Sequence, residues 1–142
     1  MLHGHFGSAD SWIKHSENLS KSLPFLLADF GYEVYVGNSR GALGYTSHKE
    51  ADMSDSEFWD FDYQKASIDD LSSCFSYIKT NGFNPEEKGI SFVGVEAGAM
   101  AMLYTLAQFE KYLTSFMHRV VYLNPAIDYP LEGPHFLDPV MD

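Results

Sequence analysis

The feature that most constrains the fold is a strand-to-helix junction around position 96. Residues 90–95 form a short apolar run, typical of a buried β-strand, and a strongly apolar helical segment begins directly after it. Between the two, positions 94–98 are Gly-Val-Glu-Ala-Gly, with Gly94 and Gly98 two residues on either side of Glu96. Glycines in this arrangement permit a very tight turn, so the sequence predicts that the Glu96 side chain is lifted above the end of a sheet.

Strand and helix patterns alternate along the chain. Ser22 and Pro24 predict the start of a short helix that Gly31 ends, because proline suits the first helical turn and glycine the position after the last. Apolar residues recur at steps of three and four within residues 61–79, which predicts an amphipathic helix. In order, the expected elements are a helix over 22–30, a strand over 33–36, a helix over 61–79, a strand over 89–95, a helix over 97–112 and a strand over 119–123.

This alternation predicts an α/β fold. Strands joined by crossover helices are parallel, and a parallel sheet is covered on both faces. The chain has 142 residues, which is enough for one domain with a real core, so we expect residues 1–142 to form a single domain. The final segment, with Pro130, Pro134 and Pro139, is expected to be irregular.

Charge and composition exclude several classes of partner. Nine lysines and arginines against twenty aspartates and glutamates give a net charge of −11, which repels phosphate backbones and anionic headgroups. Nucleic acid is therefore not an expected partner. No apolar stretch approaches the ~20 residues that span a bilayer, and residues 1–4 lack the features of a signal peptide, so the sequence predicts no membrane span and leaves the compartment open. We expect no cofactor.

Four motifs follow one another with regular spacing. They are His-Gly-His-Phe-Gly-Ser-Ala-Asp-Ser-Trp at 3–12, Gly-Asn-Ser-Arg-Gly at 37–41, Glu-Phe-Trp-Asp-Phe at 57–61 and Phe-Val-Gly-Val-Glu-Ala-Gly at 92–98. Together they resemble the acid lipases, the gastric and lysosomal type of α/β-hydrolase. The resemblance implies a partial α/β-hydrolase fold: three α/β/α layers around a short, mostly parallel sheet, without the early strands, the C-terminal strands or the lid.

The resemblance also implies roles for the first motif. His3 and Gly4 match the family's turn after its third strand, where the next residue, here His5, contributes a backbone N–H to the oxyanion hole. Ala97, which follows the nucleophile position, would contribute the second N–H. We expect the side chains of His3 and His5 to pack against the loop and hydrogen-bond to it, with no part in proton transfer.

The second motif resembles the loop after the family's fourth strand. There the residues that match Asn38 and Arg40 hold neighbouring loops together by hydrogen bonds, and Gly41 closes the motif. We therefore expect a structural role for this loop, with no substrate contact.

The chain departs from the family pattern at the residue that matters most. The family has serine where this chain has Glu96, and the triad reaction needs a hydroxyl that a histidine can deprotonate. Some α/β-hydrolases carry a nucleophilic aspartate at this turn, but glutamate is longer by one methylene, which displaces the attacking oxygen. The family's catalytic aspartate and histidine have no counterpart in this sequence. We thus expect no intact catalytic residue, and with no second ligand at suitable spacing we expect no metal site at Glu96.

A further departure is at the front of the chain. In α/β-hydrolases the third strand lies between the fourth and the fifth, and here only Met1 and Leu2 precede the His-Gly turn. Residues 33–36 and 90–95 would then each lack a partner, at roughly 1–3 kcal/mol for each unpaired buried amide. The sequence leaves three outcomes: it is part of a longer chain, another polypeptide supplies the strand, or the two strands pair directly.

Three functional hypotheses follow. The first is an acid-lipase-like domain without hydrolytic activity, with a binding or structural role or as a gene remnant, which could take a lipid or ester-like small molecule. The second is a carboxylic ester hydrolase of lipid metabolism whose site is completed by a longer chain or a partner. The third is a structural subunit in which a protein partner covers the open sheet.

Overall fold

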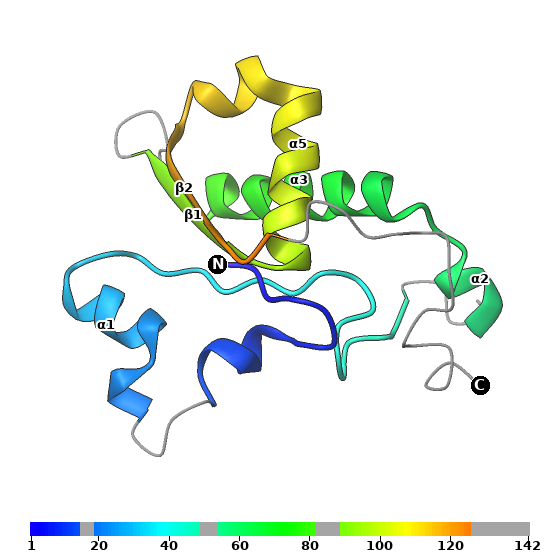
Figure 1. Ribbon diagram of the computed structural model, residues 1–142, viewed down its shortest axis with the longest axis horizontal. Coiled ribbons are helices and arrows are strands. Elements are labelled where there is room, and N and C mark those ends of the chain that lie inside the picture. Colours follow the sequence, from blue (N-terminus) through cyan, green and yellow to red (C-terminus); the bar gives the residue numbers. More distant parts are fainter. Residues whose placement is uncertain (15–18, 49–53, 82–88, 126–142) are drawn as a thin grey trace.

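The structure is a computed structural model that describes residues 1–14, 19–48, 54–81 and 89–125. Its elements alternate between helices and a small sheet (Figure 1). In chain order they are η1 (Ala9–Trp12), η2 (Leu19–Lys21), α1 (Leu23–Asp29), α2 (Asp55–Trp59), α3 (Tyr63–Thr80), β1 (Ile90–Val95), α5 (Ala97–Thr114) and β2 (Met117–Leu123).

The sheet is parallel, as the alternation predicted. β1 pairs with β2 in a register that places Phe92 opposite Val120. On the other side of β1, Leu2 forms parallel bridges to both Gly94 and Gly37. The Leu2 N–H donates to the Val93 carbonyl at 2.9 Å. The N-terminal residues thus lie between β1 and the segment that ends at Gly37.

The predicted strand over residues 33–36 is wrong. This segment forms no strand, and only Gly37, just beyond it, makes a bridge. The Met1 amino group donates to the Tyr35 carbonyl and the Gly37 N–H donates to the Met1 carbonyl. Because a strand needs a longer run of ladder hydrogen bonds, these two bonds do not make the segment one. Since Leu2 separates Gly37 from β1, the rearranged sheet with direct pairing is not formed.

The other predicted elements are confirmed, with small differences at their ends. α1 begins after Ser22, and α3 begins after Asp62, whose carboxylate accepts the Lys65 N–H at 2.7 Å. β2 begins two residues earlier than predicted, at Met117, and α5 extends to Thr114. The irregular segment with Pro130, Pro134 and Pro139 lies outside the described residues.

Among the described α-helices, α2 was not predicted. α2 lies in what the sequence indicated as a polar loop, and it begins with a capping box: Ser54 accepts the Glu57 N–H while the Glu57 carboxylate accepts the Ser54 N–H at 3.0 Å. This pattern of serine and glutamate three residues apart is a helix-start signal that the sequence contains.

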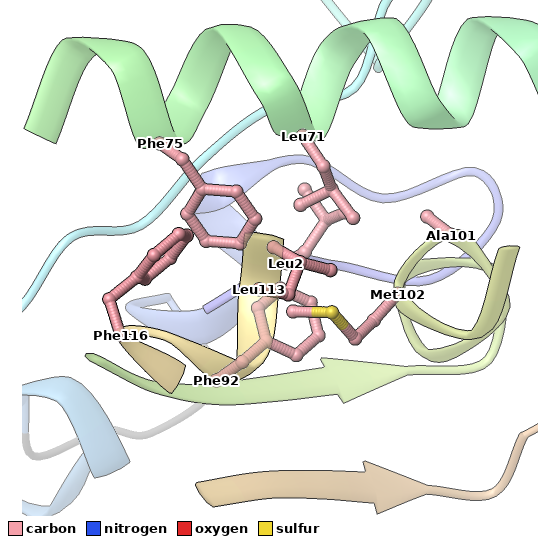
Figure 2. Packing of buried hydrophobic residues seen from close by; sticks show 8 residues of the cluster. All are labelled: Leu2, Leu71, Phe75, Phe92, Ala101, Met102, Leu113 and Phe116. Atoms are coloured by element: carbon pink, nitrogen blue, oxygen red, sulfur yellow. The ribbon is translucent and has the colours of Figure 1, made fainter. Parts of the chain in front are cut away.

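Helices α3 and α5 cover one face of the sheet, and α1 lies on the side away from α3 (Figures 1 and 2). This arrangement agrees with the predicted α/β/α layers of a partial α/β-hydrolase fold. The core lies between the sheet and the two long helices (Figure 2). Its buried side chains are Leu2, Leu71, Phe75, Phe92, Ala101, Met102, Leu113 and Phe116.

The predicted buried character of α5 is present in its first turns, where Ala99 and Met102 are fully enclosed. None of the helices in the described ranges has the length and apolar character needed to cross a membrane.

Candidate functional site

The turn between β1 and α5 holds Glu96 in a backbone conformation that side chains rarely adopt. Its φ is 44° and its ψ is −108°, and such positions cost about 1–3 kcal/mol each. Two hydrogen bonds keep the residue there: the Glu96 N–H donates to the Leu123 carbonyl at 3.0 Å, and the Glu96 carbonyl accepts the Met100 N–H at 3.0 Å. The end of β2 and the first turn of α5 therefore fix the strained residue.

The glycines on either side of the turn leave no space for a side chain. A Cβ at Gly98 would lie 2.6 Å from the carbonyl oxygens of both Leu2 and His3. A Cβ at Gly94 would lie 2.7 Å from the Ala99 nitrogen. Backbone atoms cannot move aside as a flexible side chain can. Glycine at position 98 is therefore needed for α5 to pack on the N-terminal segment, and glycine at position 94 is needed for β1 to pack on the start of α5.

The Glu96 side chain turns back over the His-Gly turn and leaves α5 uncapped. It makes no cap hydrogen bond at the helix start, and a Cβ at Gly4 would lie 2.6 Å from its Oε2 atom. Within the described residues, the carboxylate has no hydrogen bond and no ion pair. Glu96 is half-buried, so an unpaired negative group stands beside Gly4.

His3 and His5 lie on the same turn in different surroundings. His3 is only 4% exposed; its Nδ1 donates to the Gly4 carbonyl at 2.7 Å, and its Nε2 accepts the Ser39 N–H at 3.3 Å. His5 lies at the surface, with its ring stacked near Tyr63 at a centroid distance of 6.0 Å. Partial desolvation lowers the pKa of His5 from its ordinary 6.5, although the negative charge of Glu96 acts to raise it.

Ala97 is the first residue of α5, and its N–H has no acceptor inside the helix. Its carbonyl accepts the Tyr63 hydroxyl at 3.2 Å. The structure thus brings Ala97, Glu96 and the His3–His5 turn to one place, at the carboxyl end of β1.

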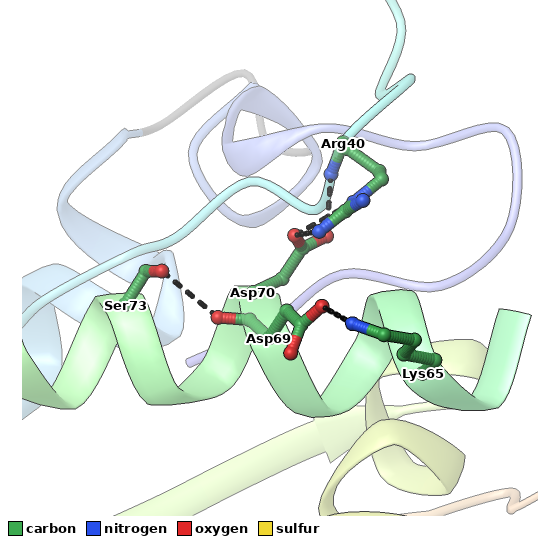
Figure 3. Close-up of polar contacts among 5 residues, drawn as sticks. All are labelled: Arg40, Lys65, Asp69, Asp70 and Ser73. Atoms are coloured by element: carbon green, nitrogen blue, oxygen red, sulfur yellow. Dashed lines mark hydrogen bonds and ion pairs between the residues drawn. The ribbon is translucent and has the colours of Figure 1, made fainter. Parts of the chain in front are cut away.

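The loop at 37–41 is attached to two other parts of the chain. The Asn38 side-chain oxygen accepts the Ala9 N–H at 2.7 Å, which connects the loop to η1. Arg40 binds Asp70 on α3 through its backbone N–H at 2.8 Å and its Nε at 2.9 Å (Figure 3). Gly41 has a φ of 70° and lies against the Trp59 ring.

No motif in the sequence indicated Tyr63, whose hydroxyl reaches the carbonyl of Ala97, or its neighbour Tyr104. The two rings are 6.4 Å apart in an edge arrangement, Tyr63 at the start of α3 and Tyr104 on α5. No local pattern in the sequence places these residues together, because they come from different helices.

A cavity beside the His3–Gly4 turn does not include Glu96. It has a volume of about 480 Å³ and lies on the side of the His3–Gly4 turn that faces α1. Its lining residues are His3, Gly4, Ser11, Trp12, Lys21, Ser22, Leu23 and Val95. The described ranges contain no group of three side chains that could hold a metal ion.

Comparison with known proteins finds lipases. The chain is 37% identical over 100 residues to mouse (Mus musculus) lipase member M, which covers 69% of this chain and 22% of the relative. It is 33% identical over 108 residues to triacylglycerol lipase 1 of Arabidopsis thaliana, covering 76% of this chain and 26% of the relative. It is 37% identical over 78 residues to human (Homo sapiens) lysosomal acid lipase/cholesteryl ester hydrolase, and this match covers 55% of this chain and 19% of the relative.

The matched part of the chain therefore spans about a fifth to a quarter of the length of these relatives. No family profile and no solved structure matches the chain. The similarity to several lipases, together with the parallel sheet and the tight turn that leads into α5, establishes the family: the chain belongs to the acid-lipase-like α/β-hydrolases.

Proposed function

We propose that this chain is an acid-lipase-like domain that does not hydrolyse esters through position 96 and that acts as a binding or structural element. Glu96 carries the proposal, since it stands on the turn where the family presents a serine hydroxyl. Ester hydrolysis by a triad needs an attacking hydroxyl and a histidine that accepts its proton. A carboxylate supplies no such proton, and loss of one triad member removes several orders of magnitude of rate.

The position of the carboxylate adds a second argument. An oxyanion hole on the His5 and Ala97 N–H groups would stabilise negative charge that develops on the substrate. The Glu96 side chain lies over Gly4, the residue before His5, so its own negative charge opposes that development. Within this proposal residues 1–142 form one partial domain.

The second candidate is a lipid ester hydrolase whose site is completed by a longer chain or a partner. One observation favours it: the relatives are named as lipases and are several times longer than the stretch that matches. The mass of the native protein separates the candidates, because a species near the 16.0 kDa of this sequence supports the first and a species several times heavier supports the second.

The test of the first candidate is ester turnover. We expect purified protein and its Glu96→Ala variant to cleave p-nitrophenyl butyrate at the same background rate. Glu110→Ala, on the exposed part of the same helix, serves as the control for a lost negative charge. Turnover by the unmodified chain that disappears in Glu96→Ala but persists in Glu110→Ala would contradict the proposal.

A further inference from the structure

The cavity beside the His3–Gly4 turn is lined by four separate parts of the chain. The turn and Val95 of β1 contribute to its wall, as do Ser11 and Trp12 of η1 and residues 21–23, where η2 meets α1. Its volume of about 480 Å³ is within the range of roughly 300–1,000 Å³ that is typical of small-molecule pockets. The cavity is therefore large enough for a small organic ligand.

Apolar side chains form one part of the wall. Trp12, Leu23 and Val95 are all lining residues, and none of the three is fully buried. Leu23 is 39% exposed. Because contact with a ligand would remove this apolar surface from water, the cavity favours an occupant with an apolar body.

Lys21 brings a positive charge to the same wall. Lys14, Arg40 and Lys65 each bind an aspartate, whereas the described residues contain no ion pair for Lys21. The chain as a whole has a net charge of −11, so a lysine without a carboxylate partner is unusual in it. The positive charge of Lys21 is thus available to an anionic group of a ligand.

Ser11 adds a hydrogen-bond donor to the cavity. Its Oγ atom accepts the Ser8 N–H at 3.1 Å, and its own hydroxyl proton has no acceptor within the described residues. The other lining serine, Ser22, already donates to the Ile13 carbonyl at 3.0 Å. An acceptor oxygen on the ligand would therefore find a donor in Ser11.

We propose that this cavity binds a small carboxylate with an apolar body. Lys21 balances the charge of the carboxylate, and Trp12, Leu23 and Val95 contact the body. A carboxylate fits better than a phosphate, because a phosphate carries up to two negative charges and is bound best by several charged donors, whereas this wall offers a single lysine.

The inference rests on the proposed function, since it gives the binding role a place and a class of ligand. It does not depend on the chemistry of Glu96, which does not line the cavity. The two proposals can therefore fail separately. Ester turnover that depends on Glu96 refutes the proposed function, whereas ligand titration alone decides the carboxylate site.

The experiment is a titration of the full chain with 3-phenylpropionate, with 3-phenylpropanamide as the neutral compound of the same shape. The indole N–H signal of Trp12 in NMR reports binding, because no acceptor within the described residues holds this group. Trp59→Phe assigns the signal, since the chain has two tryptophans. Hexanoate and hexanamide repeat the comparison with an aliphatic body.

We expect the carboxylate to shift the Trp12 signal and to bind about 3- to 10-fold more tightly than its amide, as is typical of one partly solvated charge pair. A preference for the carboxylate in either pair of compounds supports the proposal and shows whether the body is aromatic or aliphatic. Equal binding of carboxylate and amide in both pairs, or binding of none of the four compounds, would overturn it.

Variants test the charge and the apolar wall. Lys21→Met keeps the length of the side chain without its charge, and we expect the preference for the carboxylate to disappear. Lys111→Met, at an exposed position on α5, is the matched control and should keep the preference. Leu23→Ala should weaken binding of both compounds by about 3- to 10-fold. Leu26→Ala should not, since Leu26 is 40% exposed on the same helix but does not line the cavity.

Circular dichroism and thermal melting of each variant verify that it is folded. If Lys21→Met and Leu23→Ala both fold and both bind the carboxylate and the amide like the unmodified chain, the proposal is wrong.

Discussion

Single residues determine the chemistry of the turn between β1 and α5, and Glu96 is the most important of them. It combines a positive φ of 44° with a carboxylate that lies over Gly4 and has no partner within the described residues. A charge in that place acts on its neighbours. His5 is such a neighbour, because the charge of Glu96 acts to raise its pKa.

The pKa of His5 provides a prediction at this scale. Partial desolvation lowers it, Glu96 raises it, and His3 lowers it further. In the Glu96→Gln variant the raising effect is lost, so we expect the pKa of His5 to fall below its value in the unmodified chain. An NMR titration of the His5 ring measures this, with Glu110→Gln as the control. An unchanged or higher pKa in Glu96→Gln would show that the two side chains do not interact.

The same shift has a consequence for stability. The folded state has the lower His5 pKa, so the unfolded state binds more protons as pH falls below about 6.5. The contribution of this group to stability is therefore complete above pH 6.5 and is lost as pH falls toward the folded pKa. Between pH 5 and pH 7, the free energy of unfolding measured with urea should depend less on pH in His5→Gln than in the unmodified chain.

At the scale of elements, the 37–41 loop is held to α3 by Arg40 and Asp70 (Figure 3). Asp70 accepts from both the backbone and the guanidinium of Arg40, and its side chain is only 17% exposed. Asp69, the next residue on the same helix, forms only an exposed pair with Lys65 four residues earlier. Asp70 therefore connects the 37–41 loop to α3, whereas its neighbour Asp69 makes a contact within α3 alone.

This difference predicts different stabilities for two matched variants. Asp70→Asn should lower the free energy of unfolding by about 1–2 kcal/mol, since it weakens a multiple charge-assisted connection between the loop and α3. Asp69→Asn should lower it by no more than about 0.5 kcal/mol, as expected for an exposed pair on a helix. Urea denaturation of both variants tests this, and equal losses would mean that the loop is not anchored through Asp70.

Local signals predicted some elements well and missed others. The strand over 90–95 and the helix that follows Glu96 were identified because each is a continuous apolar segment. The strand expected over 33–36 had the right residue types, but a strand exists only where a partner extends beside it. α2 has a capping box but only five residues, too few to show the apolar spacing of a helix, so its residues resembled a polar loop.

At the scale of the whole molecule, Leu2 connects parts that are distant in sequence. It bridges Gly37 and Gly94, and its side chain is 4% exposed in the core with Leu71 and Phe75 (Figure 2). The N-terminal segment, the sheet and α3 therefore meet at one residue.

We expect Leu2→Ala to lower the free energy of unfolding by about 2–4 kcal/mol, because it leaves a cavity at this meeting point. Leu43→Ala is the matched control, since Leu43 is 73% exposed and its truncation should change stability by no more than about 0.5 kcal/mol. Thermal or urea unfolding of both variants provides the comparison. If Leu2→Ala leaves the free energy of unfolding unchanged, the core does not depend on the N-terminal segment.

The sequence by itself determined the alternation of helices and strands, the parallel sheet, the glycine spacing of the turn between β1 and α5, and the carboxylate on that turn, because each depends on residues that are close in the chain. Tertiary structure alone decided that Leu2 lies between Gly37 and β1, that Glu96 turns over Gly4, and that Tyr63 of α3 lies close to Tyr104 of α5. These features depend on contacts between segments up to about a hundred residues apart, and no local pattern encodes which of many apolar or aromatic side chains will meet.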